Sequence, residues 1–133
     1  MYFAKKNTDS RICIETAKTI IVGGRGIETA DMYANLKKIA NGMKAGFGAS
    51  RGMIDNGLAN DTMLIGQSGK TVAPNLYIGV GVSGALQHIS GIKDSKVIVA
   101  INNDEQAPIF EIADYILVQD ANTALNDLIE ELK

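Results

Sequence analysis

A glycine-rich turn carries the clearest chemical signal in this sequence. Gly79, Gly81 and Gly84 have the spacing G-x-G-x-x-G, directly after the apolar residues 76–80, and the helix-forming residues 85–88 follow. A strand, a tight glycine turn and a helix start can bind phosphate, because the glycines let backbone N–H groups approach an anion and the helix N-terminus adds partial positive charge. The same spacing also occurs where a strand and a helix only pack closely, so this motif alone leaves both interpretations open.

Unusual polar side chains follow most of the apolar runs, at the point where each predicted strand ends. In an open α/β sheet, ligands bind outside the carboxyl ends of the strands, so we expect these side chains to converge at one edge. Such an edge would form a long site, suited to a ligand of dinucleotide size. Strand ends also carry ordinary polar turn residues, but arginine, glutamine and histidine are not typical of turns. The residues are Arg25, Ser50, Arg51, Gln67, Ser68, Ser83, Asn102 and Asp120.

Several familiar catalytic patterns fail on their spacing. Residues 66–71 read G-Q-S-G-K-T, which is shorter than the P-loop pattern G-x-x-x-x-G-K-T and does not support ATP hydrolysis. Residues 81–84 do not fit the nucleophile pattern G-x-S-x-G, and His88 follows Ser83 on the same short helix, which is a poor arrangement for a catalytic triad. One histidine and one cysteine offer no metal-ligand spacing. Asp104 lies near the position of an NAD-recognising acid, but the chain lacks room for a substrate domain, so a complete dehydrogenase is disfavoured.

Length and charge narrow the class of protein further. The 133 residues suffice for one domain with its own core. A formal net charge of -2 provides no electrostatic footprint for nucleic acid, and no apolar run approaches the roughly 20 residues that a membrane helix needs. The single Cys13 cannot form an internal disulfide, so we expect a reducing compartment, cytoplasmic in a prokaryote or an equivalent. Residues 1–9 are predicted to be a linker or a truncated end, which leaves 10–133 as the domain.

Apolar runs that alternate with amphipathic segments set the predicted fold. Strands are expected over residues 18–22, 44–49, 62–65, 76–80, 96–101 and 115–118, with a short edge strand over 11–16. Helices are expected over 30–42 after the capping residue Thr29, over 53–57 as a brief turn, over 108–113, and from about 122 to the end. Because the strands are nearly all apolar, both faces of the sheet should be covered. The predicted fold class is α/β, a doubly wound, mostly parallel sheet with helices on both faces.

Read together, these segments resemble the C-terminal, FAD-binding part of the alpha subunit of electron-transfer flavoproteins. The segment L-Y-I-G-V-G-V-S-G-A-L-Q-H-I-S-G and the V-I-V-A-I-N that comes after it are similar to the signature of that family. Four further pieces match in order and spacing, namely G-G-R-G at 23–26, G-A-S-R at 48–51, G-Q-S-G-K at 66–70 and A-P-I-F-x-x-A-D-Y at 107–115.

The resemblance covers about residue 18 to the end and does not include the N-terminal domain that the family carries before this part. The chain is therefore identified as an isolated Rossmann-like FAD-binding domain or a naturally short relative. It departs from the family pattern in small ways: Gly79 stands where a slightly larger residue is usual, Leu86 where a β-branched one is usual, and Ser68 where threonine is common.

The resemblance implies a non-covalently bound FAD along the strand ends. Arg51 would lie close to the isoalloxazine ring, where a fixed guanidinium favours reduced, anionic flavin and raises its potential. Gln67 and Ser68 would hydrogen-bond the ring, and His88 would donate a hydrogen bond at its pyrimidine end. Asn102 and Asp120 match residues at the AMP half of the cofactor. The full implied set is Arg25, Ser50, Arg51, Ile65, Gly66, Gln67, Ser68, Ser83, Gly84, Ala85, Leu86, Gln87, His88, Asn102 and Asp120.

The function that the resemblance implies is electron transport by a carrier, not catalysis by a self-contained enzyme. FAD would relay electrons from flavoprotein dehydrogenases of the acyl-CoA type to a quinone reductase or another acceptor oxidoreductase, with an electron-transfer flavoprotein beta subunit as the partner in a heterodimer. Neither nucleic acid nor membrane insertion is expected. The first alternative is an FAD- or nucleotide-binding module with a structural or sensing role, and the second is the disfavoured NAD-dependent oxidoreductase.

Overall fold

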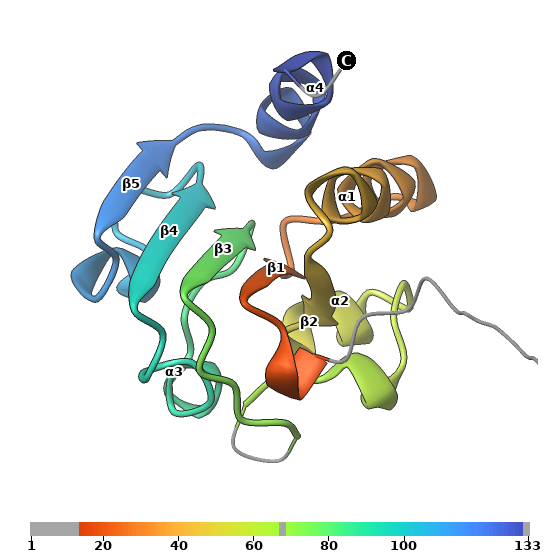
Figure 1. Ribbon diagram of the computed structural model, residues 1–133. Helices are drawn as coiled ribbons and strands as arrows, with labels where there is room; N and C mark the ends of the chain where they lie inside the picture. Colours follow the sequence, from red (N-terminus) through yellow and green to blue (C-terminus); the bar gives the residue numbers. More distant parts are fainter. Residues whose placement is uncertain (1–13, 67–68, 132–133) are drawn as a thin grey trace, which may run out of the picture.

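A five-stranded parallel sheet forms the centre of the protein, with the strand order β2-β1-β3-β4-β5 (Figure 1). The computed structural model describes residues 14–66 and 69–131. The strands are β1 (Thr19–Gly23), β2 (Gly46–Ala49), β3 (Leu76–Val80), β4 (Val97–Asn102) and β5 (Tyr115–Val118). The α-helices are α1 (Ala30–Met43), α2 (Arg51–Asp55), α3 (Leu86–Ile89) and α4 (Ala121–Glu131). Short 3-10 helices follow the same order as η1 (Ile14–Thr16), η2 (Asp61–Met63) and η3 (Pro108–Glu111).

The strand order confirms the predicted doubly wound α/β fold and locates its switch point. From β1 the chain first adds β2 on one side, and then crosses to add β3, β4 and β5 on the other. Loops that leave β1 and β3 therefore diverge to opposite sides of the sheet and open a crevice at their carboxyl ends. The predicted boundary between residues 9 and 10 lies outside the described residues.

Each face of the sheet has its own apolar core. Ile21, Val80 and Ile101 point to the face that α1 and α4 cover side by side. Ile20, Val22 and Tyr77 point to the other face, where the segments around α3 and η3 pack. Alternate strand residues thus supply two buried layers, which is the arrangement expected of a parallel sheet between helices.

Helix α1 forms as the sequence predicts. The hydroxyl oxygen of Thr29 accepts a hydrogen bond from the backbone N–H of Met32 at 3.1 Å, so the capping residue satisfies one of the first unpaired donors of the helix. Leu36 and Ile39 are buried against the sheet on the same stripe. The helix ends where Lys44 adopts a left-handed conformation with φ of 56°.

Two predicted strands are wrong over part of their length, although Leu64 and Ile65 each form an isolated parallel bridge. Residues 14–16, expected within an edge strand over 11–16, form the 3-10 helix η1, which brings Ala17 against Gly46 of β2, while 11–13 lie outside the described residues. Residues 61–63 form η2 in place of the first part of the strand predicted at 62–65. The side chain of Asn60 accepts the backbone N–H of Thr62 at 3.0 Å, and such a local bond favours a turn over a sheet ladder.

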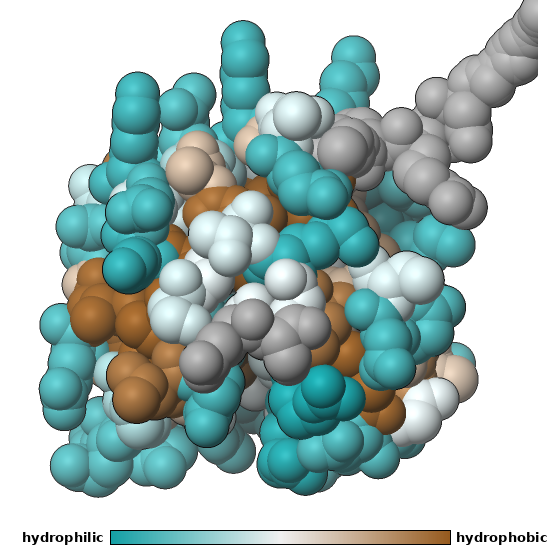
Figure 2. Space-filling view, turned by 90° about the horizontal axis from the view of Figure 1, so that it is seen from below, coloured by the Kyte–Doolittle hydropathy of each residue, from teal (hydrophilic) through white to brown (hydrophobic). Residues whose placement is uncertain are grey.

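Strand β5 forms where it was predicted, but the expectation that both faces of the sheet are covered is wrong there. Tyr115 is 66% exposed, and the other three residues of the strand are also exposed. β5 pairs only with β4, and α4 turns away from it to pack on α1 (Figure 1). Figure 2 shows apolar surface at the left-hand edge of the molecule, the edge at which β5 lies in Figure 1. The sequence alone could not distinguish this strand from a core strand, because its residues are equally apolar.

Candidate functional site

The loops after β1 and β3 meet through their backbones at the switch point. The N–H of Gly24 donates to the carbonyl of Val80 at 3.1 Å, and the N–H of Gly26 donates to the carbonyl of Gly81 at 3.0 Å. A Cβ on Gly81 would lie 2.8 Å from Cα of Gly26, and Gly81 has a φ of +70°. Only glycine satisfies both conditions, so the G-x-G-x-x-G motif fixes the floor of the crevice between the two loops.

A cavity of about 420 Å³ opens at the carboxyl ends of β1, β2 and β3. Most of the residues predicted for the site line it together. They are Arg25, Ser50, Arg51, Ile65, Gly66, Ser83, Gly84, Ala85, Gln87 and His88. Leu86 does not line this cavity, and its side chain is 78% exposed. The predicted residues Gln67 and Ser68 lie outside the described residues.

A second cavity of about 290 Å³ continues the first along the sheet edge. Arg25 and Ser83 line both cavities, and the second reaches Asn102 and Asp120 at the ends of β4 and β5. The structure therefore brings those predicted strand-end residues that it describes to one edge of the sheet, where the two cavities form one long site. An extended, two-lobed site of this kind suits a ligand with two parts joined by a linker, which is the shape of a dinucleotide.

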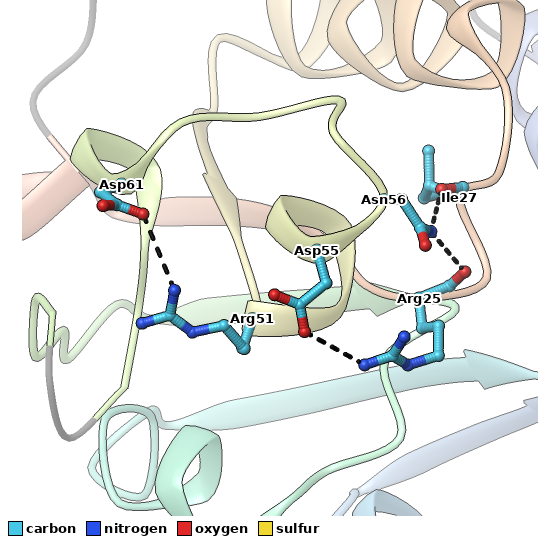
Figure 3. Close-up of polar contacts among 6 residues, drawn as sticks. All are labelled: Arg25, Ile27, Arg51, Asp55, Asn56 and Asp61. Carbon is cyan, nitrogen blue, oxygen red and sulfur yellow. Dashed lines mark hydrogen bonds and ion pairs between the residues drawn. The ribbon is translucent and has the colours of Figure 1, made fainter.

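Two guanidinium groups belong to residues that line the first cavity, Arg25 in the loop after β1 and Arg51 at the start of α2 (Figure 3). Nη2 of Arg25 lies 3.4 Å from Oδ2 of Asp55, and Nη1 of Arg51 lies 3.7 Å from Oδ1 of Asp61. All four side chains are about half exposed or more, so these ion pairs are weak and leave both cations able to attract an anion. Two cationic side chains therefore line the first cavity.

The loop that carries Arg25 is held in place by Asn56, at the end of α2. The side-chain amide of Asn56 donates to the carbonyl of Arg25 at 3.0 Å and to that of Ile27 at 2.9 Å (Figure 3). α2 in turn packs closely, since a Cβ on Gly52 would lie 2.7 Å from Cβ of Arg25. These contacts tie the β1 loop and α2 together, and so position Arg25 and Arg51 relative to each other.

Ser50 provides a buried donor that the fold itself does not use. Its side chain lines the first cavity and is only 7% exposed, yet its hydroxyl has no hydrogen-bond partner among the described residues. A ligand group in the cavity can accept from this hydroxyl, and a typical hydrogen bond contributes about 0.5–1.5 kcal/mol net. Its position beside Arg51 favours a polar, anionic or carbonyl-bearing ligand.

His88 lies in the wall of the same cavity and is 5% exposed. Its Nδ1 lies 2.9 Å from the carbonyl oxygen of Ile65, and its Nε2 lies 2.7 Å from the hydroxyl of Tyr77. Burial lowers the pKa of His88, and the hydrogen bond to Ile65 offsets part of that effect. The sequence analysis did not predict a role for Tyr77, because an aromatic residue in an apolar strand is typical of a core. The hydroxyl of this residue, in an otherwise aliphatic strand, was the one feature that could have indicated a polar contact.

The polar residues of the second cavity also stabilise their own loops. The amide nitrogen of Asn102 donates to the carbonyl of Val82 at 3.0 Å, and its oxygen accepts the N–H of Asp104 at 2.9 Å. The carboxylate of Asp120 accepts the backbone N–H of Thr123 at 3.1 Å at the start of α4. Both residues are therefore fixed at the sheet edge by structural hydrogen bonds.

Within residues 14–66 and 69–131, no group of three potential metal-ligating side chains lies together. No helix in that part of the chain is long and apolar enough to span a membrane. The donors at this site are backbone amides, a hydroxyl and two guanidinium groups, which are suited to phosphate and to polarised carbonyl oxygens.

Comparison with known proteins identifies relatives of this chain. A family model described as the electron transfer flavoprotein FAD-binding domain matches residues 13–93. The electron transfer flavoprotein subunit alpha of Pseudomonas aeruginosa is 51% identical over 115 residues, which is 86% of this chain and 37% of the relative. The subunit alpha of Paracoccus denitrificans is 48% identical over 119 residues, covering 90% of this chain and 39% of the relative.

A probable mitochondrial subunit alpha of Saccharomyces cerevisiae is 48% identical over 120 residues, or 90% of this chain and 35% of that protein. The chain thus spans well under half the length of the curated relatives it matches.

Proposed function

The chain belongs to the family of the electron transfer flavoprotein FAD-binding domain, and from that premise we propose that it holds a non-covalent FAD along the carboxyl ends of its strands and relays electrons through it. The family gives the cofactor and the electron-transfer role. The observation that carries the assignment to this site is the continuous pair of cavities over the glycine switch point, with the buried, unpartnered hydroxyl of Ser50 in one of them.

The residues present fit the chemistry of FAD. Arg25 and Ser83 line both cavities, and the rest of the turn at 83–85 lines the first. Together they would hold the pyrophosphate by backbone N–H groups and positive charge. Ser50, Arg51 and His88 line the cavity proposed for the ring, and Asn102 and Asp120 line the one proposed for the AMP half. Bound FAD would supply both one- and two-electron transfer.

Arg51 has the proposed electrostatic role. A guanidinium is charged at all accessible pH values, so it favours negative charge on a group bound in the first cavity at every working pH. Gln67 and Ser68 are proposed to hydrogen-bond the ring, as the resemblance of their segment implies.

The proposed role of the protein is that of an electron carrier, with the beta subunit of an electron-transfer flavoprotein as its partner. The relatives' names designate an alpha subunit, and the apolar side chains exposed on β5 support coverage by polypeptide outside this chain. Acyl-CoA-type dehydrogenases are the proposed donors, and a quinone reductase or another oxidoreductase is the proposed acceptor. The lone cysteine of the sequence supports a reducing, cytoplasmic-type compartment.

A redox titration of the FAD-loaded chain tests the ring assignment. Arg51→Ala should lower the flavin potential by tens of millivolts. A unit charge at ~4 Å is worth between about 1 kcal/mol in water and about 4 kcal/mol at an effective dielectric constant of ~20, and the half-exposed Arg51 favours the lower value. About 1.4 kcal/mol corresponds to about 59 mV for one electron. Arg51→Lys is the matched control, since it keeps the charge and should retain most of the potential. Equal potentials for wild type and Arg51→Ala would contradict the assignment.

A further inference from the structure

A buried chain of hydrogen bonds joins β3 to the wall of the first cavity. The hydroxyl of Tyr77, a fully buried residue of β3, lies 2.7 Å from Nε2 of His88, and Nδ1 of His88 lies 2.9 Å from the carbonyl oxygen of Ile65. The two rings are tilted, with centroids 5.9 Å apart. Both nitrogens of the only histidine in the sequence are therefore engaged by the fold itself.

The chemistry of these partners fixes the positions of the protons. A carbonyl oxygen can only accept, so Nδ1 of His88 must carry a hydrogen and donate it to Ile65. In the neutral imidazole Nε2 then has a lone pair, and it accepts the hydroxyl hydrogen of Tyr77. Burial lowers the pKa of His88 and raises that of Tyr77, so both groups keep their neutral forms near pH 7.

The charged groups of the cavity do not change this conclusion. The charged side chains that line its cavity are Arg25 and Arg51, and no carboxylate appears among the described lining residues. β3 presents the hydroxyl of Tyr77 to the imidazole, and the segment after η2 presents the carbonyl of Ile65. Both arginines are paired with carboxylates, Arg25 with Asp55 and Arg51 with Asp61, so burial is what disfavours a second proton on the imidazole.

We propose that Tyr77 is a positioning residue of this cavity, which fixes the orientation and the proton state of His88 toward the bound ligand. The proposal rests on the proposed function where it identifies that ligand as FAD. While the Tyr77 bond holds, His88 offers no N–H to the cavity, in contrast to the donor role that the resemblance implies for it. A ligand atom that needs a donor from His88 must compete with Tyr77 for Nε2.

Gly79 gives Tyr77 the room to make this contact. Gly79 lies two residues after Tyr77 on the same face of β3, and a Cβ on it would lie 3.0 Å from both the hydroxyl oxygen and Cε1 of Tyr77. The ring thus leans along the strand over the glycine. Gly79→Ala should displace the hydroxyl while keeping it chemically intact, and so provides a graded test of its position.

The presence of a single histidine makes the test unambiguous. We would label the full chain with ¹⁵N-histidine and record both ring nitrogens by NMR without cofactor. The expected spectrum shows a protonated Nδ1 and an unprotonated, hydrogen-bonded Nε2, unchanged between pH 8 and pH 6, where an ordinary histidine titrates with a pKa near ~6.5. A His88 that titrates in this range, or that carries its proton on Nε2, would overturn the proposal.

Variants separate the hydroxyl from the packing of the ring. Tyr77→Phe should shift the Nε2 resonance to that of an imidazole nitrogen without a hydrogen bond, and Gly79→Ala should shift it part of the way. Tyr33→Phe is the matched control, because the one hydrogen-bond partner of the Tyr33 hydroxyl among the described residues is the sulfur of Met63, at 3.7 Å. An unchanged Nε2 resonance in Tyr77→Phe, or in Gly79→Ala if the first variant does not fold, would refute the positioning role.

The functional arm uses the same variants loaded with FAD. Tyr77→Phe should change the pH profile of the flavin potential, whereas Tyr33→Phe should leave it unaltered; identical profiles for Tyr77→Phe and wild type would count against the proposal. Different results would refute the proposed FAD-binding function and the proposed role of Tyr77. A chain that binds no FAD refutes the proposed function and leaves the NMR result intact, while a titrating His88 in an FAD-binding chain refutes only the role of Tyr77.

Discussion

Replacement of Gly81 by alanine should damage the floor of the site more than any ordinary glycine substitution. Gly81 has a φ of +70°, and a Cβ there would lie 2.8 Å from Cα of Gly26 in the loop after β1. Gly57 is the matched control, because it has a similar φ of +81° and no atom within 4 Å of the position of a Cβ. The two positions share the backbone strain and differ in the contact.

The magnitude follows from these two effects. A side chain in the left-handed region costs roughly 1–2 kcal/mol, and that cost applies to both variants. Forcing extra atoms into close-packed structure costs typically about 1–3 kcal/mol, and that applies only to Gly81→Ala, since its neighbour is backbone and cannot rotate away. We therefore expect Gly81→Ala to lower the free energy of unfolding by about 2–5 kcal/mol, against a total of about 5–15 kcal/mol for a typical domain.

Urea unfolding of both variants and wild type measures this difference. Gly57→Ala should lose about 1–2 kcal/mol, and Gly81→Ala should lose at least ~1 kcal/mol more and bind FAD more weakly. Should the two variants have equal free energies of unfolding, the close approach of the two loops would not constrain residue 81, and the argument for the glycine floor would be wrong.

Three further perturbations give expected outcomes. Asp120→Ala should lower the free energy of unfolding by about 1 kcal/mol, because the Asp120 carboxylate caps α4 at Thr123. The same variant should retain FAD more weakly on desalting, with little change in the flavin potential, whereas Asp120→Asn should keep the cap. Asp61→Asn should change the free energy of unfolding by less than about 0.5 kcal/mol in urea titrations, since the pair with Arg51 is exposed and 3.7 Å long. The pKa of His88 is lowered in the folded state. Below pH ~6.5 the histidine is therefore protonated in the unfolded chain before it is protonated in the folded one. The free energy of unfolding then falls by up to about 1.4 kcal/mol per pH unit until the pH reaches the folded-state pKa. Urea midpoints from pH 7.5 to 5 should show that increment in wild type and not in His88→Gln.

Much of the fold follows directly from local sequence. The apolar runs of β1, β3 and β4 are buried on both faces, so their composition determines their class, and Thr29 marks the start of α1 through a single hydrogen bond. Polar residues that follow parallel strands meet at one edge by geometry alone. That rule is the reason why Arg25, Ser50 and Ser83 could be placed in one site before the structure was known.

The remaining features depend on contacts between distant residues or on what covers a surface. The Tyr77–His88 bond joins positions 11 residues apart, and no local pattern indicates that the side chains meet. β5 resembles a core strand in sequence, but its exposure depends on where α4 packs. At Asn60, one side-chain hydrogen bond decides between a turn and the predicted strand.

The most direct test of the account is the visible absorption spectrum of the purified chain after FAD is added and the excess removed by desalting. An FAD site at the strand ends predicts a retained flavin band near one FAD per chain, which bleaches and recovers reversibly on reduction and reoxidation. If no flavin is retained by the chain alone, the same measurement with the beta subunit present decides the question. No retained flavin in the assembled complex would contradict the FAD site described at the strand ends.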